Sequence, residues 1–484
     1  MSSHQVDEET PLLLPAKQPP KRTPLPWRQF SIILFLQLAE PLTSQVISPF
    51  APQLIRDIGI TGGDETKVGY YVGLMHSLFF ATQALTVLHW SRVSDHIGRK
   101  PVILTGLFGL SVSMYCFGLS KTFWGLVFSR ALNGALNGNI GVIKSMMVEI
   151  TDSTNLAQAY AYMPIAWSSG GTLGPLIGGA LSRPADRFPN VFGHLAFFKE
   201  YPYFLACAVP ATFSAIAWLV TFLFLKETVT SRFTLGRLLT GKLNEESAPK
   251  DPTSLEASTN SLDNAKDEER PLSLRSLLVP RVIIAAGNYG TLSLLDIAFR
   301  AVQPLFFATP MELGGLGLAP PEIGNILAVY GVINGLFQIF FFADLHDKYG
   351  TKKIYTVAMA SAFPLIMTLP LLNFLGRTQG LSWMVWTIVG VQLVISVVMN
   401  LGYACVFIYI AAASPNRASL GATNGIAQMV VSIMRALGPA SVNSLFSYSI
   451  ENPHHAWVVY YFMIGLAFIA IAASSRLPHQ LWKN

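Results

Sequence analysis

Charged residues and cysteines are both scarce in this sequence. Of its 484 residues only 12% are charged, 51% are hydrophobic, and the mean hydropathy is +0.44, a composition unlike that of soluble globular proteins. The three cysteines, Cys116, Cys207 and Cys405, lie far apart without the spacing of metal ligands. That pattern argues against a disulfide framework and a structural zinc site. Because no nucleophile–base pair, phosphate-binding loop or metal-ligand cluster is visible either, we expect no enzyme, no cofactor and no bound metal.

The hydrophobic residues gather in runs of about 20, the length of helix that crosses the hydrocarbon core of a bilayer. Twelve such spans can be drawn, which predicts an all-α membrane protein. The predicted spans cover residues 29–51, 68–90, 101–119, 123–145, 157–182, 201–225, 281–307, 321–343, 354–376, 382–412, 416–446 and 454–475. The basic residues that give the net charge of +6 lie mainly between these spans, so they indicate membrane topology and not binding to nucleic acid.

The spans form two sets of six. We predict an N-terminal bundle at 29–225 and a C-terminal bundle at 281–476, joined by a polar cytoplasmic linker at 226–280 and flanked by tails at 1–28 and 477–484. With the N-terminus inside, the inner segments hold 22 Lys and Arg residues and the outer loops hold seven. This bias predicts that both termini lie in the cytoplasm.

The polar, proline-rich N-terminal tail contains a short acidic dileucine pattern, with Glu8 followed by Leu12 and Leu13. Adaptor proteins bind such patterns when they sort membrane proteins to endosomes and vacuoles, although six-residue patterns also arise by chance. We therefore expect either a vacuolar or a plasma membrane location, with sorting adaptors as partners in the first case.

The sequence HWSRVSDHIGRKPVILTG connects the second and third spans. Gly98 allows a sharp turn at little steric cost, and Asp95 can accept hydrogen bonds from a helix N-terminus. Arg99 and Lys100 hold the loop on the inner side of the membrane. The spacing D-x-x-G-R-K-P resembles the signature loop of the major facilitator superfamily. In that family, an acidic residue at the position of Glu149 joins this loop in a charge network that latches the outward-facing state.

Two features of the first half recur in the second. Asp347 and Gly350 repeat the D-x-x-G-x-K pattern after the eighth span, and Gly438-Pro439 repeats Gly174-Pro175. Two such correspondences in the same order predict two parallel six-helix repeats, as in the two halves of a major facilitator.

Polar side chains inside the first-half spans are the first candidates for function. Glu40 and Gln45 lie in the first span, and Arg130 with Asn133 in the fourth. A charge within the membrane must face a partner or water, so we expect Glu40 and Arg130 to face one cavity. Either Glu40 exchanges protons, or Arg130 simply neutralises it. In the superfamily, the arginine of the fourth helix is associated with proton coupling.

The second half offers Asp296 and Arg300, which share a helical face and either satisfy each other or form a second proton or cation site. In the eleventh span, the amides of Asn424 and Gln428 either contact substrate or bind helices together.

The fifth span is rich in glycine, which lets helices approach closely, while a proline bends it. The pattern G-x3-G-P-x2-G-G resembles the motif of the exporting, proton-antiporter branch of the superfamily. Its residues are Gly170, Gly174, Pro175, Gly178 and Gly179.

Three longer segments, NGALNGNIGVIKSMMVEI, GTLGPLIGGAL and RASLGATNGIAQMVVSIMRALGPA, resemble the zinc-induced-facilitator-like group, near the tetracycline-type drug:proton antiporters. The sequence has neither the cysteine-rich motif of the plant members nor a His-rich loop, so we do not expect direct zinc transport. The resemblance implies a monomeric secondary transporter that exports a small organic molecule or metal chelate by proton antiport. A proton symporter or uniporter and a non-transporting receptor are the alternatives.

Overall fold

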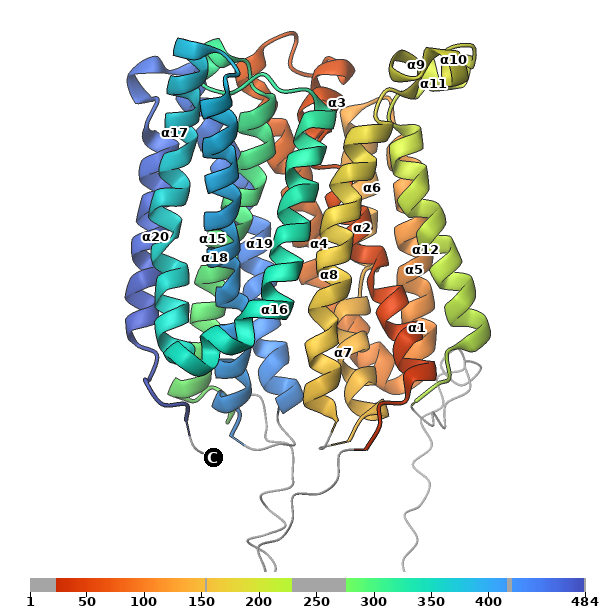
Figure 1. Ribbon diagram of the computed structural model, residues 1–484. Helices are drawn as coiled ribbons and strands as arrows, with labels where there is room; N and C mark the ends of the chain where they lie inside the picture. The colour runs from red at the N-terminus through yellow and green to blue at the C-terminus, as the bar shows by residue number, and fades with distance from the viewer. Residues whose placement is uncertain (1–22, 153–154, 229–275, 416–419, 483–484) are drawn as a thin grey trace, which may run out of the picture.

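The computed structural model describes residues 23–152, 155–228, 276–415 and 420–482. The regular secondary structure of these residues is helical (Figure 1), which confirms the predicted all-α fold. The predicted sorting pattern of Glu8, Leu12 and Leu13 lies outside the described residues, as does most of the predicted linker.

Thirteen helical segments lie among the described residues before 228. They are α1 (Trp27–Gln37), α2 (Ala39–Gln45), α3 (Ala51–Ile58), η1 (Glu65–Lys67), α4 (Val68–Ile97), α5 (Arg99–Gly118), α6 (Phe123–Leu136), α7 (Asn139–Ile150), α8 (Leu156–Leu181), α9 (Pro184–Arg187), α10 (Pro189–Phe192), α11 (Ala196–Glu200) and α12 (Phe204–Phe224).

The second half contains fewer and longer helices. They are α15 (Pro280–Ala308), η2 (Met311–Leu313), α16 (Pro320–Ala360), α17 (Ala362–Gln379), α18 (Trp383–Ala413), α19 (Leu420–Glu451), η4 (Pro453–His455) and α20 (Val458–Ser475).

Eight helical stretches of the described chain are long and apolar enough to cross a membrane by length and composition. They lie in α5, α12, α15, α16 before Ala343, the stretch from Asp344 to Gln379, α18, α19 and α20. The other four predicted spans also coincide with helices, namely α1 to α3, α4, α6 with α7, and α8. The helix order therefore follows the predicted order of spans.

Two predicted spans are not continuous helices. The first span breaks at Leu38 and again between Gln45 and Ala51, where Pro41 and Pro49 cannot donate a backbone hydrogen bond. The fourth breaks at Asn137 and Gly138, because asparagine and glycine are poor helix formers. We predicted one span at 29–51 and one at 123–145, and the structure shows that each is interrupted within its length. Broken helices near the middle of a membrane are typical of transporter binding sites.

Figure 1 shows the helices side by side, with the two ends of the described chain on the same face. We call this the terminal face, and α12 and α20 end there. Gly98 contacts Glu227 just after α12, and Lys352 beside Gly350 bonds Ser475 at the end of α20, so both loops lie on this face. The opposite face carries α3, α9 to α11 and η2, and we call it the far face. The two halves meet where α4 packs against α19 and α8 packs against α16.

The hydrophobic core differs between the two faces. Near the far face, Phe50 and Phe117 of the first half share one continuous core with Phe306 and Val442 of the second. Near the terminal face, the first half has a separate core that includes Phe30, Ile103 and Met147. Of the two cores in the first half, only the one near the far face is therefore continuous with the core of the second half.

The two D-x-x-G loops have the same backbone geometry. Gly98 has φ 106° and ψ 162°, and Gly350 has φ 75° and ψ 159°, a region that a side chain would strain. Just after each glycine a lysine donates to a backbone oxygen of the last helix of its half, from Lys100 to Phe222 (2.8 Å) and from Lys352 to Ser475 (3.3 Å). The geometry and the contacts both repeat, as expected for two related halves.

Candidate functional site

Glu40 lies in α2, just after the break in the first span, and part of its surface is exposed. The positive charges that act on its carboxylate are those of Arg435 in α19 and Lys144 in α7. Among the described side chains, neither brings a nitrogen within 4.0 Å of a Glu40 oxygen. The acid and the two bases therefore face one another without forming an ion pair. We call these three residues the central charge cluster.

Two buried amides lie beside this cluster. Gln83 of α4 and Asn137 of the fourth-span break both lie next to the Glu40 carboxylate. Gln83 is 4% exposed and Asn137 is fully buried, and both side-chain amides act on the Glu40 carboxylate as hydrogen-bonding neighbours, although no contact of the Gln83 Nε2 or of the Asn137 amide has full hydrogen-bond geometry. Because a buried amide without a full hydrogen bond is costly, these two groups can still gain from a closer polar partner beside Glu40.

The second half contributes the rest of the site through α19. Gln428 accepts a hydrogen bond from Lys144 Nζ (3.3 Å), which directly joins the two halves. Arg435 Nε donates to Ser293 Oγ of α15 (3.1 Å), and its guanidinium lies 6.0 Å from the ring of Trp167 in α8. The central charge cluster is thus built from both halves.

Asp296 and Arg300 form an ion pair (2.8 Å), the first of the two alternatives that the sequence left open. Tyr403 donates to the second Asp296 oxygen (2.8 Å), and Arg300 donates to the hydroxyl of Tyr330 (3.2 Å), which Asn400 also contacts (2.7 Å). A cavity of about 10 Å³, the space of one water, adjoins Asp296, Arg300 and Tyr330.

Neutralisation of Glu40 by Arg130 was one of the two alternatives drawn from the sequence, and the structure does not show it. It is 2% exposed in α6, and its guanidinium lies 4.7 Å from the ring centroid of Phe79. Its Nε and Nη1 have no hydrogen-bond partner, and no ion pair to it occurs among the described side chains. Arg130 lies in α6, before the break at Asn137, whereas Lys144, which does act on Glu40, lies in α7 after it.

The glycines of the fifth span let α8 approach two other elements. A Cβ on Gly174 or Gly178 would meet the backbone of Val46, at 3.1 and 1.9 Å. A Cβ on Gly179 would lie 2.7 Å from the carbonyl oxygen of Pro320 and 3.0 Å from Gly324 Cα in α16. Gly170 is packed against Pro41, and Pro175 is buried. The motif therefore seals α8 against the first span and against the second half.

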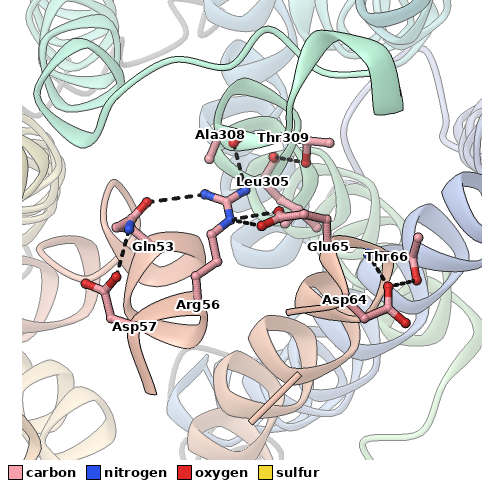
Figure 2. A network of polar contacts seen from close by, with 9 residues as sticks. All are labelled: Gln53, Arg56, Asp57, Asp64, Glu65, Thr66, Leu305, Ala308 and Thr309. Carbon is pink, nitrogen blue, oxygen red and sulfur yellow. Dashed lines mark hydrogen bonds and ion pairs between the residues drawn. The ribbon is translucent and has the colours of Figure 1, made fainter. Parts of the chain in front are cut away.

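A second contact between the halves lies at the far face, where Figure 2 shows Arg56 of α3 between Glu65 and the end of α15. Arg56 Nε donates to both Glu65 oxygens (2.8 and 3.1 Å), and Nη2 donates to the carbonyl of Ala308 (2.8 Å). The carbonyl end of a helix attracts positive charge, which favours this contact. We call Arg56, Glu65 and Ala308 the far-face latch.

Outside this latch the far face has a hollow of about 800 Å³. Arg56, Arg183 and Arg187 line it, together with Leu318 and Pro320 of the second half. The hollow lies on the outer side of the contacts that close the far face, so it opens to the compartment next to that face.

The predicted charge network at the terminal face is present in part. Arg99 donates to Glu149 (2.9 Å), and the Glu227 carboxylate accepts from the backbone N–H groups of Arg99 (2.8 Å) and Lys100 (3.0 Å). These bonds join α5, α7 and the end of α12 within the first half. The Asp95 side chain lies outside the described side chains, although its backbone is helical.

The remaining predicted site residues occupy separate places. Gln45 packs against Gly174, and Asn133 is buried in α6 with its Oδ1 unpartnered. Asn424 is half-buried one turn before Gln428 in α19. Asp347 is exposed beside His346 (3.6 Å) at the terminal face.

The comparisons with known proteins decide the family. The model of the Major Facilitator Superfamily matches residues 33–439. This chain belongs to that superfamily. Its members are transporters and not enzymes, so this is an integral, multi-pass membrane protein that carries a small molecule.

Individual relatives of this major facilitator agree with the predicted group. It is 30% identical to Protein ZINC INDUCED FACILITATOR 1 of Arabidopsis thaliana, over 88% of this chain and 85% of that one. It is 28% identical to Efflux pump azaK of Aspergillus niger, over 99% and 96% of the two chains. The crystal structure of the human organic anion transporter MFSD10 (TETRAN) has the same fold, with a TM-score of 0.62 at 18% identity over 94% and 100% of the chains.

Sequence reasoning missed several residues that surround the candidate site. Lys144 belongs to the central charge cluster, Gln83 and Asn137 lie beside it, and Arg56 forms the far-face latch. A signal for Lys144 was available, because a lysine within a predicted span is costly unless it has a function. Arg56 offered no such signal, since it lies in a predicted outer loop where basic residues are ordinary.

Proposed function

We propose that this major facilitator exports a small organic molecule by proton antiport, with Glu40 as the group that exchanges the proton. One observation carries the proposal. Glu40 lies between the halves, faces Lys144 and Arg435, and forms an ion pair with neither among the described residues. A carboxylate that is already paired resists protonation, whereas one held at a distance from its neighbouring cations can gain and lose a proton.

The far-face contacts support a cycle of alternating access. The conformer in hand is closed there by the glycine contact of α8 with α16, by the far-face latch and by the shared apolar core. Substrate would then load from the terminal face, which we propose is the cytoplasmic one. Rocking of the halves would break these contacts and open the far face.

The direction of transport is supported by two findings. The relative from Aspergillus niger is named an efflux pump. The fifth-span glycines form the contact that closes the far face, and an exporter must open that contact only after it has bound its substrate. We propose the vacuolar or the plasma membrane as the location. The Arg99–Glu149 network and the two D-x-x-G loops would stiffen each half so that it moves as one body.

Reconstituted vesicles test the proposal directly. Purified protein in liposomes with an acidic lumen is offered a panel of dyes that includes rhodamine 123, rhodamine 110, fluorescein and ethidium. We expect uptake of at least one dye into the acidic lumen, and its loss when nigericin dissipates the proton gradient. Uptake only with an alkaline lumen would identify symport, and uptake that ignores the gradient would identify uniport. Either result, or no uptake of any dye, contradicts antiport.

A further inference from the structure

The central charge cluster holds more charge than proton exchange requires. One carboxylate would suffice for a proton, yet Glu40 faces two basic side chains, Lys144 and Arg435, that approach from different halves. Keeping two cations and one anion apart inside a membrane protein is costly. The arrangement becomes favourable when a bound molecule presents an opposite charge to each of the three groups.

We propose that this cluster binds a zwitterionic organic molecule. Its cationic group would contact Glu40, and its carboxylate or phosphate would contact Lys144 and Arg435. The inference rests on the proposed antiport and specifies the substrate class of the same site.

The neighbouring groups fit such a molecule. The amides of Gln83 and Asn137 are buried next to the Glu40 carboxylate without full hydrogen-bond geometry, and they can accept from an ammonium group or donate to an acid. Gln428 holds Lys144 in place by accepting its hydrogen bond. Trp167, which lies against Arg435, offers an aromatic face to a ring of the substrate.

The sign of proton coupling also favours a zwitterion over a simple anion. The charged groups that face Glu40 are Lys144 and Arg435. Protonation of Glu40 leaves these cations uncompensated, so an anion would bind together with the proton, which is symport. A molecule whose cationic group contacts Glu40 competes with the proton, which is antiport. A simple cation would compete too, but it would leave Lys144 without a counter-charge and Arg435 with only the nearby Asp296 carboxylate, which is already paired with Arg300.

Three dyes with one xanthene frame test this inference in nanodiscs without a proton gradient. Rhodamine 110 is a zwitterion, rhodamine 123 is its methyl ester and carries only the positive charge, and fluorescein carries only negative charge. Fluorescence polarisation gives the dissociation constant of each. We expect wild-type protein to bind rhodamine 110 at least tenfold more tightly than either of the other two. We also expect acidification to weaken that binding.

The variants Lys144→Gln and Arg435→Gln should bind rhodamine 110 no better than rhodamine 123, and Arg435→Lys should restore part of the preference. Lys121→Gln is the matched control, because Lys121 is an exposed lysine paired with Glu200 and remote from the site. Equal or tighter binding of rhodamine 123 by the wild type, no binding of any dye, or an unchanged preference in Lys144→Gln would overturn the inference. Gradient-driven uptake of rhodamine 123 alone would leave antiport standing and remove only the zwitterion.

Discussion

At the level of single residues, Arg56 is the clearest link between the halves at the far face. Its guanidinium contacts Glu65 within the first half and the Ala308 carbonyl in the second. The flat, branched donor set of arginine makes both contacts at once, which a single ammonium group cannot do. We therefore expect this side chain to set the balance between closed and open far faces.

The variant Arg56→Gln should open the far face more often. A hydrogen bond to a charged group contributes about 1.5–3 kcal/mol, so the open population should rise roughly tenfold. The measurement is labelling of Asn443→Cys, a position buried against Gly73 of α4, with a membrane-impermeant maleimide. Arg377→Gln is the control, because Arg377 bonds the carbonyls of Met311 and Glu312 within the second half. Equal labelling of both variants at the wild-type rate would rule out the latch.

Arg130 presents a different balance of stability and function. A buried cation without an acidic partner destabilises the fold, so Arg130→Met should raise the Tm of the purified protein. If the charge serves coupling, the same variant should lose transport roughly tenfold or more, which corresponds to about 1.4 kcal/mol or more. Thermal unfolding and dye uptake on one preparation give both values. A lower Tm would mean that Arg130 is structural, and unchanged uptake would remove it from the coupling mechanism.

Individual residues also show what a sequence can tell. Glu40 and Asp296 stand out because acids are rare inside spans, but their partners depend on how the helices pack. The Asp296–Arg300 pair is local, one turn apart, and was foreseeable. The basic neighbours of Glu40 were not foreseeable, because Arg435 is nearly 400 positions away and Lys144 follows a helix break that hydropathy does not reveal.

At the level of helices, the fifth-span motif acts through the absence of side chains. Gly179 and Gly324 bring α8 and α16 into backbone contact near the far face. The sequence motif predicted close packing but could not name α16 as the partner, because glycines show that something approaches and not what approaches.

A pair of alanine variants on α8 separates this contact from helix propensity. Gly179→Ala places a Cβ 2.7 Å from the Pro320 oxygen and 3.0 Å from Gly324 Cα, whereas Gly171→Ala meets nothing within 4 Å. Overpacking costs about 1–3 kcal/mol, so Gly179→Ala should raise far-face labelling roughly tenfold and slow transport. Gly171→Ala should leave labelling unchanged and stabilise the helix by about 1 kcal/mol. Similar labelling of the two variants would show that the close contact has no role in closure.

Helix breaks were the least predictable elements. Hydropathy treats 29–51 and 123–145 as ordinary spans, although the chain bends at Leu38 and at Asn137. Those bends bring Glu40 next to Asn137. The site therefore arises where local helix propensity fails, which a hydropathy average over 20 residues cannot resolve.

For the whole molecule, the duplicated halves explain why the fold was predictable. Twelve apolar runs, a repeated loop and a family resemblance were enough for the architecture, and the matching backbones of Gly98 and Gly350 show the repeat in three dimensions. The conformational state was not predictable, since the same sequence must be stable with either face closed. Transport also requires the arrangement in which the far face is open, and reaching it breaks the far-face contacts described above.

The central claim is that Glu40 exchanges a proton for substrate, and counterflow tests it most directly. Liposomes containing wild-type or Glu40→Gln protein are preloaded with a transported dye, and dye exchange is compared with accumulation driven by an acidic lumen. We predict that the wild type shows both, whereas Glu40→Gln loses accumulation, because a permanently neutral amide has no proton to trade. Exchange by Glu40→Gln should persist only at a raised dye concentration, because the cationic group of the dye has lost its carboxylate partner. Accumulation by Glu40→Gln at the wild-type level would contradict the account.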